Sequence, residues 1–233
     1  MSDYRIVEPT LVSSPTEIVN FMRTYIGEGT IWPHLIVTIR ETMVAFVIGS
    51  AAGVVVGLAL TAFPFAGAVM DPLLTFLNAM PRVALAPMFI IWFGIGETSK
   101  IALAVSLIFF IVLVSTQSGT KSVDREHQVL MRSLGASRAA LLTKVVVPAS
   151  VPSIFAGLRL AIVFSLVGVV FGEMLSAQAG LGQQLAYFTT VFNLAGSFGI
   201  VIVLAVFALV LTSILSFAER RLLSWAPEAT EFR

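Results

Sequence analysis

The sequence predicts an all-α membrane protein with five transmembrane helices. Only 12% of its 233 residues are charged and 58% are hydrophobic, whereas about a quarter of the residues of a soluble domain carry charge. The apolar residues gather in five segments, each close to the roughly 20 residues that a helix needs to cross the hydrocarbon core. We expect the spans at residues 35–62, 72–94, 100–118, 155–176 and 196–218.

A basic segment between the third and fourth spans orients the chain. From Gly119 to Arg159 it carries six Lys or Arg and two Asp or Glu, and an excess of basic residues marks cytoplasmic loops. Arg220 and Arg221 give the same signal after the last span. With an odd number of spans, we expect the N-terminus outside and the C-terminus inside. The expected parts are an outer segment (1–34), a transmembrane domain (35–224) with a cytoplasmic loop (119–154), and a cytoplasmic tail (225–233).

A short helix is predicted before the first span. Ser14 can cap it, Pro15 suits its first turn, and Glu17 completes a capping box. Apolar residues follow on one face, so this helix can lie along the membrane surface or pack on the bundle. In the first span, Gly49, Gly53 and Gly57 recur at a spacing that favours close helix packing.

Several classes of site are missing from the sequence. There is no cysteine, and the two histidines, His34 and His127, are too few and too far apart for a metal site. The chain has no paired carboxylates, no Ser/His/Asp set and no phosphate-binding loop of the form Gly-x-x-x-x-Gly-Lys-[Ser/Thr]. We therefore expect no catalytic residues, no metal, no cofactor bound by this chain and no nucleic-acid partner.

Polar residues inside the spans are candidates for a solute path. Arg82 lies near mid-membrane, where a charge costs about 2.5–3.5 kcal/mol, so it should face protein or water. Pro81 and Pro87 each remove a backbone donor and predict a break in this helix. Alternatively, Arg82 pairs with an acid such as Glu173, or reaches the interface, and Glu173 makes a helix–helix hydrogen bond. The path candidates are Asn78, Pro81, Arg82 and Glu173.

The outer connection at 177–195 carries no charge, yet it is too polar to span the membrane. A short re-entrant or interfacial helix fits it best. If this helix faces outward, Gly180, Gly182 and Gln183 can contribute to an external gate. Simple loop packing is the alternative.

The cytoplasmic loop has the pattern of two helices joined at a glycine. Residues 124–134 can form the first helix, and Gly135 can stop it because glycine tolerates the left-handed conformation. Ser137 can cap a second helix, which we expect Pro148 to end. Both helices carry apolar residues that a plain connection does not need. The loop therefore predicts a docking site for a soluble partner.

This loop resembles the EAA loop of binding-protein-dependent ABC importer permeases. Gly135 is followed by nine residues and then by Val145-Val-Val-Pro148, as in that motif. The run Arg132-Ser-Leu-Gly-Ala-Ser-Arg138 is similar to the branch that imports nitrate, taurine, alkanesulfonates and pyrimidine precursors. Trp92-Phe-Gly-Ile-Gly-Glu-Thr-Ser-Lys100 and Gly180-Leu-Gly182 support the same branch.

The resemblance implies a type I importer fold and a set of partners. Two ATP-binding cassette subunits, which hold ATP and Mg, would grip the loop through Glu126, Arg132, Leu134, Gly135, Ala136, Ser137, Arg138 and Pro148. An external binding protein would deliver the solute. A second permease copy, most simply an identical one, would complete the path, and the assembly would reside in the bacterial inner (plasma) membrane.

Two departures from the family pattern stand out. The signature Glu-Ala-Ala positions are Val129, Leu130 and Met131 here, and Glu126 lies one helical turn earlier. Members of this branch also commonly have an additional N-terminal helix ahead of the segment at which this chain begins.

The best hypothesis is the permease subunit of an ATP-driven importer for a small polar solute, with Arg82 favouring an anion. The alternative is a subunit of an ATP-independent secondary transporter or channel. That alternative leaves the helix-Gly-helix-Pro loop unexplained.

Overall fold

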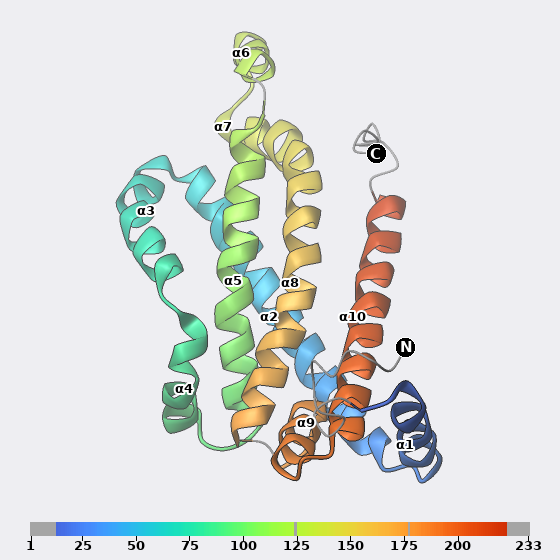
Figure 1. The fold of residues 1–233 in the computed structure, drawn as a ribbon. Coiled ribbons are helices and arrows are strands. Elements are labelled where there is room, and N and C mark those ends of the chain that lie inside the picture. Colours follow the sequence, from blue (N-terminus) through green and yellow to red (C-terminus); the bar gives the residue numbers. More distant parts are fainter. Residues whose placement is uncertain (1–12, 124, 177, 223–233) are drawn as a thin grey trace, which may run out of the picture. The chain divides into compact units, whose positions relative to one another are not determined.

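The described part of the chain is built of helices (Figure 1). The computed structural model describes residues 13–123, 125–176 and 178–222, and these ranges contain no strand. The all-α prediction is therefore confirmed. In chain order the elements are α1 (Pro15–Gly27), α2 (Ile31–Ala62), α3 (Pro64–Ala79), η2 (Arg82–Leu85), α4 (Ala86–Phe93), α5 (Glu97–Lys121), α6 (Arg125–Ser133), α7 (Arg138–Leu141), η3 (Leu142–Val146), α8 (Val147–Ser176), α9 (Leu181–Thr190) and α10 (Leu194–Leu222).

Four helices among the described residues are long and apolar enough to cross a membrane. They are α2, α5, the continuous helix Arg138–Ser176 and α10, and α3 with the segment Arg82–Phe93 passes as a fifth, broken span. The prediction of five spans is confirmed when this pair counts as one. The helices run past the predicted bounds. For example, α2 begins at Ile31 instead of residue 35, because Pro33 falls in its first turn, where a missing amide donor costs little.

The predicted helix end at Pro148 is wrong. Residues 138–176 form one helix, in which α7 passes through the π-helical turn η3 into α8. The Val147 amide donates to the Leu142 carbonyl, five residues back. This wider turn stands directly before Pro148, where it relieves the clash between the proline ring and the carbonyl four residues earlier. The helix therefore bulges before the proline and continues.

The chain divides into two compact units. Unit 1 comprises residues 1–45, 83–104 and 166–210, and unit 2 comprises residues 46–82, 105–165 and 211–233. The helices α2, α5, α8 and α10 contribute residues to both units. Each unit has a hydrophobic core of its own.

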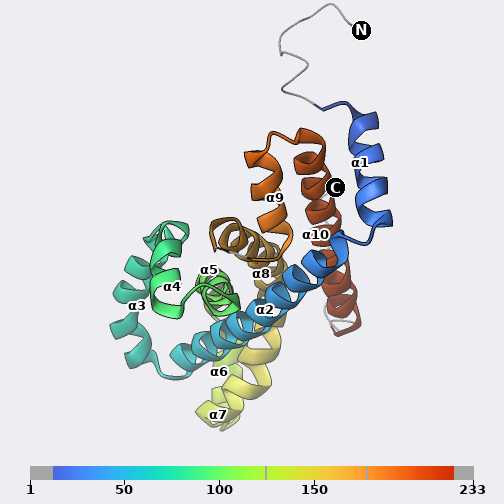
Figure 2. The ribbon, with the colours of Figure 1, turned by 90° about the horizontal axis from the view of Figure 1, so that it is seen from below.

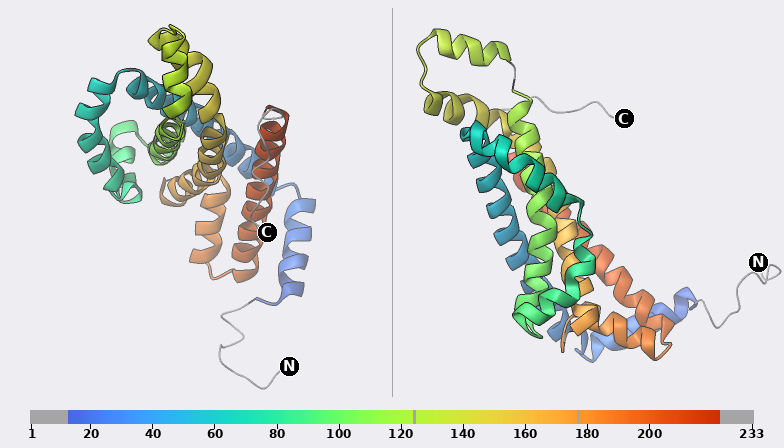
Figure 3. Two further views of the ribbon diagram at one scale, coloured as in Figure 1. Left: turned by 90° about the horizontal axis from the view of Figure 1, so that it is seen from above. Right: turned by 90° about the vertical axis from the view of Figure 1, so that its left-hand side faces the viewer.

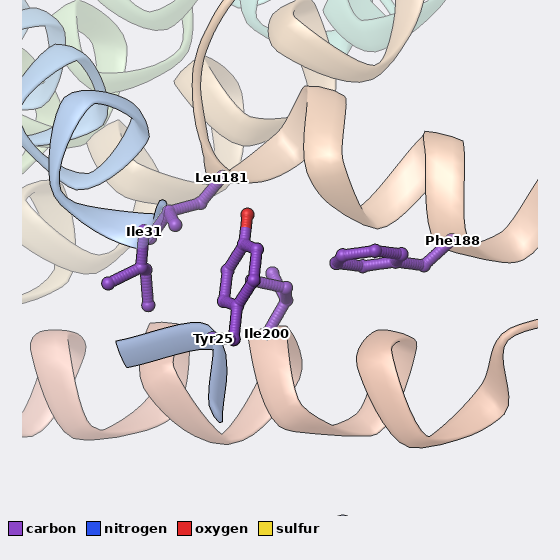
Figure 4. Packing of buried hydrophobic residues seen from close by; sticks show 5 residues of the cluster. All are labelled: Tyr25, Ile31, Leu181, Phe188 and Ile200. Atoms are coloured by element: carbon purple, nitrogen blue, oxygen red, sulfur yellow. The ribbon is translucent and has the colours of Figure 1, made fainter. Parts of the chain in front are cut away.

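The core of unit 1 joins α1, α2, α9 and α10. Tyr25, Ile31, Leu181, Phe188 and Ile200 pack together there (Figure 4). Figure 2 shows α1 beside the first turns of α10, where a side chain on Gly199 would collide with Met22. Of the two alternatives for this helix, packing on the bundle is the one that the structure shows.

The start of α1 is the predicted capping box. The Glu17 amide donates to Ser14 Oγ at 3.2 Å, and the Ser14 amide donates to Glu17 Oε2 at 3.0 Å. The second hydrogen bond is the main reason why the pKa of Glu17 lies below its ordinary value.

Unit 2 is organised around the contact of α2 with α5. Ile108 and Val112 are fully buried in its core. A side chain at Gly53 would lie 2.8 Å from the Phe109 carbonyl oxygen, and one at Gly57 would lie 2.8 Å from Thr116. The small residues of the first span therefore serve close helix packing, as the sequence predicts.

Candidate functional site

The first candidate region, in unit 2, is the loop at residues 119–154, which contains α6 (Arg125–Ser133) and α7 (Arg138–Leu141). The amide of Gly135 donates to the Arg132 carbonyl and that of Ala136 to the Met131 carbonyl, both at 3.0 Å. With φ of +80° at Gly135, these two hydrogen bonds form a Schellman motif, which satisfies the last carbonyls of α6. The predicted helix stop is confirmed.

The second helix of the loop starts where the sequence places it. Ser137 Oγ accepts a hydrogen bond from the Ala140 amide at 3.2 Å and caps α7. Arg132 and Arg138 are exposed on either side of the turn. Pro148 is half-buried in the first turn of α8. Glu126 belongs to α6, but its side chain lies outside the described part of the chain.

Apolar side chains are exposed on α6 and on the residue that follows it. Val129, Leu130 and Leu134 are 60%, 59% and 74% exposed. In the right-hand view of Figure 3, α6 stands away from the long helices of the bundle. Exposed apolar side chains flanked by arginines are the composition of a protein-binding surface.

The second region, also in unit 2, is the end of α3. Met80 is extended, with ψ of 137°, and Pro81 follows it, so the helix breaks there as predicted. The Arg82 guanidinium donates from Nη2 to the Leu77 carbonyl at 2.9 Å and to Asn78 Oδ1 at 3.0 Å. It also stacks on Phe110, 4.1 Å from the ring centre.

These contacts explain how a charge is tolerated at this depth. Arg82 closes the last turn of α3 by binding a carbonyl that has no partner within the helix. The aromatic ring supplies a further favourable contact for the cation. Among the described residues, these groups and not a carboxylate hold the guanidinium.

The third region, in unit 1, is centred on Glu173, which is 1% exposed. Its Oε1 accepts from Thr38 Oγ1 at 2.7 Å, and its Oε2 accepts from the Gly182 amide at 2.7 Å. The Leu181 amide donates to Thr38 Oγ1 at 2.9 Å. Glu173 on α8 and Thr38 on α2 therefore satisfy the first amides of α9. The predicted helix–helix hydrogen bond of Glu173 is present.

Two glycines allow this close approach. A side chain at Gly180 would come within 2.2 Å of the Glu173 carboxyl carbon, and one at Gly182 within 2.3 Å of the Val170 carbonyl oxygen. Gly180 also has φ of +127°, a conformation that other residues rarely adopt. Gln183, the third gate candidate, lines a cavity of about 280 Å³ with Glu173 and Tyr187. The structure thus brings Glu173 together with the three gate candidates.

Sequence reasoning missed further members of this network. His34 Nδ1 accepts from the Gly180 amide at 3.1 Å, and His34 Nε2 lies 3.0 Å from Gln184 Nε2. Gln184 Nε2 also donates to Gln183 Oε1 at 2.9 Å, and which atom donates between His34 Nε2 and Gln184 Nε2 depends on the tautomer of the imidazole. Tyr25 extends this series of hydrogen bonds, because its hydroxyl donates to Gln184 Oε1 at 3.0 Å.

A buried ion pair between α2 and α5 was also missed. Lys100 on α5 pairs with Glu41 on α2, and both side chains are almost fully buried. The spacing of His34, Thr38 and Glu41 places three polar residues on one face of an apolar helix. This polar stripe on α2 was the feature of the sequence that could have indicated both the ion pair and the hydrogen-bond network. No group of three or more acidic or histidine residues in the described ranges could hold a metal ion.

The comparisons with known proteins agree on one family. The profile of the family described as "Binding-protein-dependent transport system inner membrane component" matches residues 30–224. The chain is 33% identical to the formylaminopyrimidine transport permease protein ThiX of Halalkalibacterium halodurans over 94% of this chain and 88% of that protein. It is 32% identical to the taurine transport system permease protein TauC of Escherichia coli over 96% of this chain and 83% of that protein.

A solved structure supports the fold. A chain described as an amino acid ABC transporter with histidines superposes with a TM-score of 0.70, covering 90% of this chain and 99% of that one. Their sequences are 19% identical.

Proposed function

This chain belongs to the family of binding-protein-dependent transport system inner membrane components, and on this premise we propose how it is coupled to its partners and which solute it passes. As a member, it is a permease subunit of an ATP-driven importer in the inner membrane. Membership therefore decides against an ATP-independent transporter or channel. ATP hydrolysis takes place on separate subunits of the transporter.

The observation that carries the coupling proposal is the exposed apolar face of α6 next to a fixed turn. Val129, Leu130 and Leu134 are exposed apolar side chains, the kind of residue that forms the core of a protein interface. The Schellman turn at Gly135 and the cap at Ser137 fix the direction of the segment that follows. We infer that two ATP-binding subunits, carrying ATP and Mg²⁺, each dock one such loop. Apolar contacts replace the acidic contact of the usual Glu-Ala-Ala sequence.

The continuous helix Arg138–Ser176 supports the transmission of movement from this docking site. It starts three residues after the turn at Gly135 and carries Glu173 near its other end. A displacement of the loop therefore acts directly on a helix whose last turns bind α9. We propose α9, with Gly180, Gly182 and Gln183, as an outer gate that receives solute from an external binding protein.

The path itself is proposed to run along the end of α3, in unit 2. Asn78, Pro81 and Arg82 lie there, and Arg82 keeps donors that are not used by Leu77 and Asn78. This favours a small polar solute with an anionic group. A second copy of the chain is proposed to form the opposite side.

The docking proposal is tested by Gly135→Leu. The substitution meets no neighbouring atom, so it acts through the positive φ, which costs leucine about 1–2 kcal/mol. We expect normal membrane insertion but loss of most ATPase subunits from the purified complex. The matched control is Gly27→Leu, which also has open space around it and no positive φ. Undiminished co-purification with Gly135→Leu means that this turn does not form the docking site.

A further inference from the structure

Unit 2 contains a polar cavity that the docking loop and Arg82 do not explain. A cavity of about 520 Å³ lies between the end of α2, the start of α3 and the end of α5, and one of about 230 Å³ adjoins α3 and α5. Asp71, Gln117 and Lys121 line both. The smaller cavity is also lined by Asn78 and Phe110, the two side chains that hold Arg82.

The charges at this cavity differ from the other charges of the same spans. Seven charged side chains lie between Ile31 and Lys121. Five of them have partners: Arg40 with Glu97, Glu41 with Lys100, and Arg82 with Asn78 and Phe110. The remaining two are Asp71 and Lys121.

Asp71 and Lys121 form no ion pair and no side-chain hydrogen bond with any residue that the structure describes, and neither does the amide of Gln117. Both charged side chains are exposed, and they lie at the ends of the expected spans: Asp71 directly precedes the span 72–94, and Lys121 is the last residue of α5. Two opposite charges that share a cavity without pairing leave room for a group between them.

The walls of the larger cavity are fixed by hydrogen bonds. Thr61 on α2 and Thr120 on α5 have their hydroxyl oxygens 2.9 Å apart, so that one hydroxyl donates to the other while the second donates to a backbone carbonyl of its own helix. A side chain at Gly67 would lie 2.9 Å from the Leu60 carbonyl oxygen, so α3 leaves α2 in close contact. These hydroxyls are satisfied within the wall, and the free polar groups that remain are those of Asp71, Gln117 and Lys121.

We propose that this cavity binds the transported solute as a zwitterion. A protonated amine donates to the Asp71 carboxylate, and a carboxylate or sulfonate accepts from the Lys121 ammonium. Gln117 lies on the same stretch of α5 as Lys121 and offers a donor and an acceptor to the atoms between. The inference rests on the proposed permease function and adds to it the class of solute and a subsite within one chain.

Direct binding tests the proposal. The permease is purified with its ATPase subunits in lipid nanodiscs, without nucleotide and without binding protein, and is titrated calorimetrically with taurine, β-alanine and isethionate. Isethionate has the sulfonate of taurine but a hydroxyl in place of the amine. We expect taurine or β-alanine to bind once per permease chain and isethionate to bind at least about tenfold more weakly, because it lacks a charged donor for Asp71.

Variants separate the two charges. Asp71→Asn and Lys121→Gln should each weaken zwitterion binding by about tenfold or more, since each removes a charge-assisted contact. Only Lys121→Gln should weaken binding of isethionate. The double variant Asp71→Lys with Lys121→Asp should bind the zwitterion more tightly than either single variant does, because the solute can bind in the reverse orientation. Arg23→Gln removes an exposed charge on α1 and is the control.

Three results overturn the proposal: no binding of either zwitterion, equal binding of taurine and isethionate, or unchanged affinity in Asp71→Asn and Lys121→Gln. Co-purification of the ATPase subunits and ATP hydrolysis are measured on the same samples. If both are retained while zwitterions fail to bind, only the cavity assignment is wrong. If the ATPase subunits are absent from wild-type complexes, the proposed coupling fails instead.

Discussion

Glu173 shows why a carboxyl group is retained in an apolar helix. Its two oxygens are used by Thr38 and by the Gly182 amide, and burial is almost complete. The first amides of a helix have no partner within the helix, so a buried helix start needs acceptors from elsewhere. Glu173 supplies one of them to α9 across a distance of nine residues in sequence. Its packing against Gly180 and Gly182 makes these three residues interdependent.

Glu173→Leu should therefore destabilise the packing of α9 against α2 and α8. The change leaves the Gly182 amide without its acceptor and the Thr38 hydroxyl with only the His34 carbonyl, and an unsatisfied buried donor costs about 1–3 kcal/mol. We expect a lower thermal denaturation midpoint of the purified complex and reduced uptake. Glu173→Gln is the matched control, because its amide oxygen can still accept one of the two hydrogen bonds. Equal stability of Glu173→Leu and wild type contradicts the anchoring role.

At the scale of elements, the second span is two helices joined by a capped break. Pro81 ends α3, and Arg82 returns its guanidinium to the Leu77 carbonyl and to Asn78. The same side chain stacks on Phe110 of α5. Arg82 thus connects the end of one helix to the face of another while it keeps a positive charge near the proposed path.

Arg82→Ala should abolish uptake while the ATPase subunits still co-purify. It removes the charge offered to the solute, and α3 loses only a terminal cap, worth about 1 kcal/mol. Arg82→Lys keeps the charge but not the planar fork that reaches two acceptors, so we expect partial uptake. The measurement is ATP-dependent accumulation of the solute that the cognate external protein binds. Loss of assembly in Arg82→Ala indicates a structural role instead.

The elements differ in how far the sequence predicts them. The capping box at Ser14 and the stop at Gly135 follow from residues within one helical turn, so local chemistry was sufficient. The π turn before Pro148 was not predictable, because a proline signals a missing donor but not how the helix adapts. In the Glu173 network, the contacts of Thr38 with Glu173 and of His34 with Gly180 join positions 135 and 146 residues apart. Only the polar stripe of α2 pointed to it.

At the scale of the whole molecule, the spans are poorly covered by the chain itself. In the most apolar stretch of α10 only 11% of the residues are buried, compared with 39% in Arg138–Ser176. Leu209, Ile214 and Phe217 of α10 are each more than 60% exposed. Lipid or a second copy must cover such a surface. A solute path needs polar walls on all sides, which lipid cannot supply.

Two permease chains per transporter are therefore the expected composition. Native mass spectrometry of the intact complex, released from detergent, should give a mass that contains two chains of 25.0 kDa each together with two ATPase subunits. Co-expression of tagged and untagged permease is the complementary measurement, since a homodimer carries the untagged chain through purification on the tag. The untagged chain should be retained in wild type and in Glu173→Gln. A mass that fits a single permease chain contradicts the dimeric path. A particle that contains a second, different permease chain agrees with a path formed by two subunits, but it contradicts the homodimer.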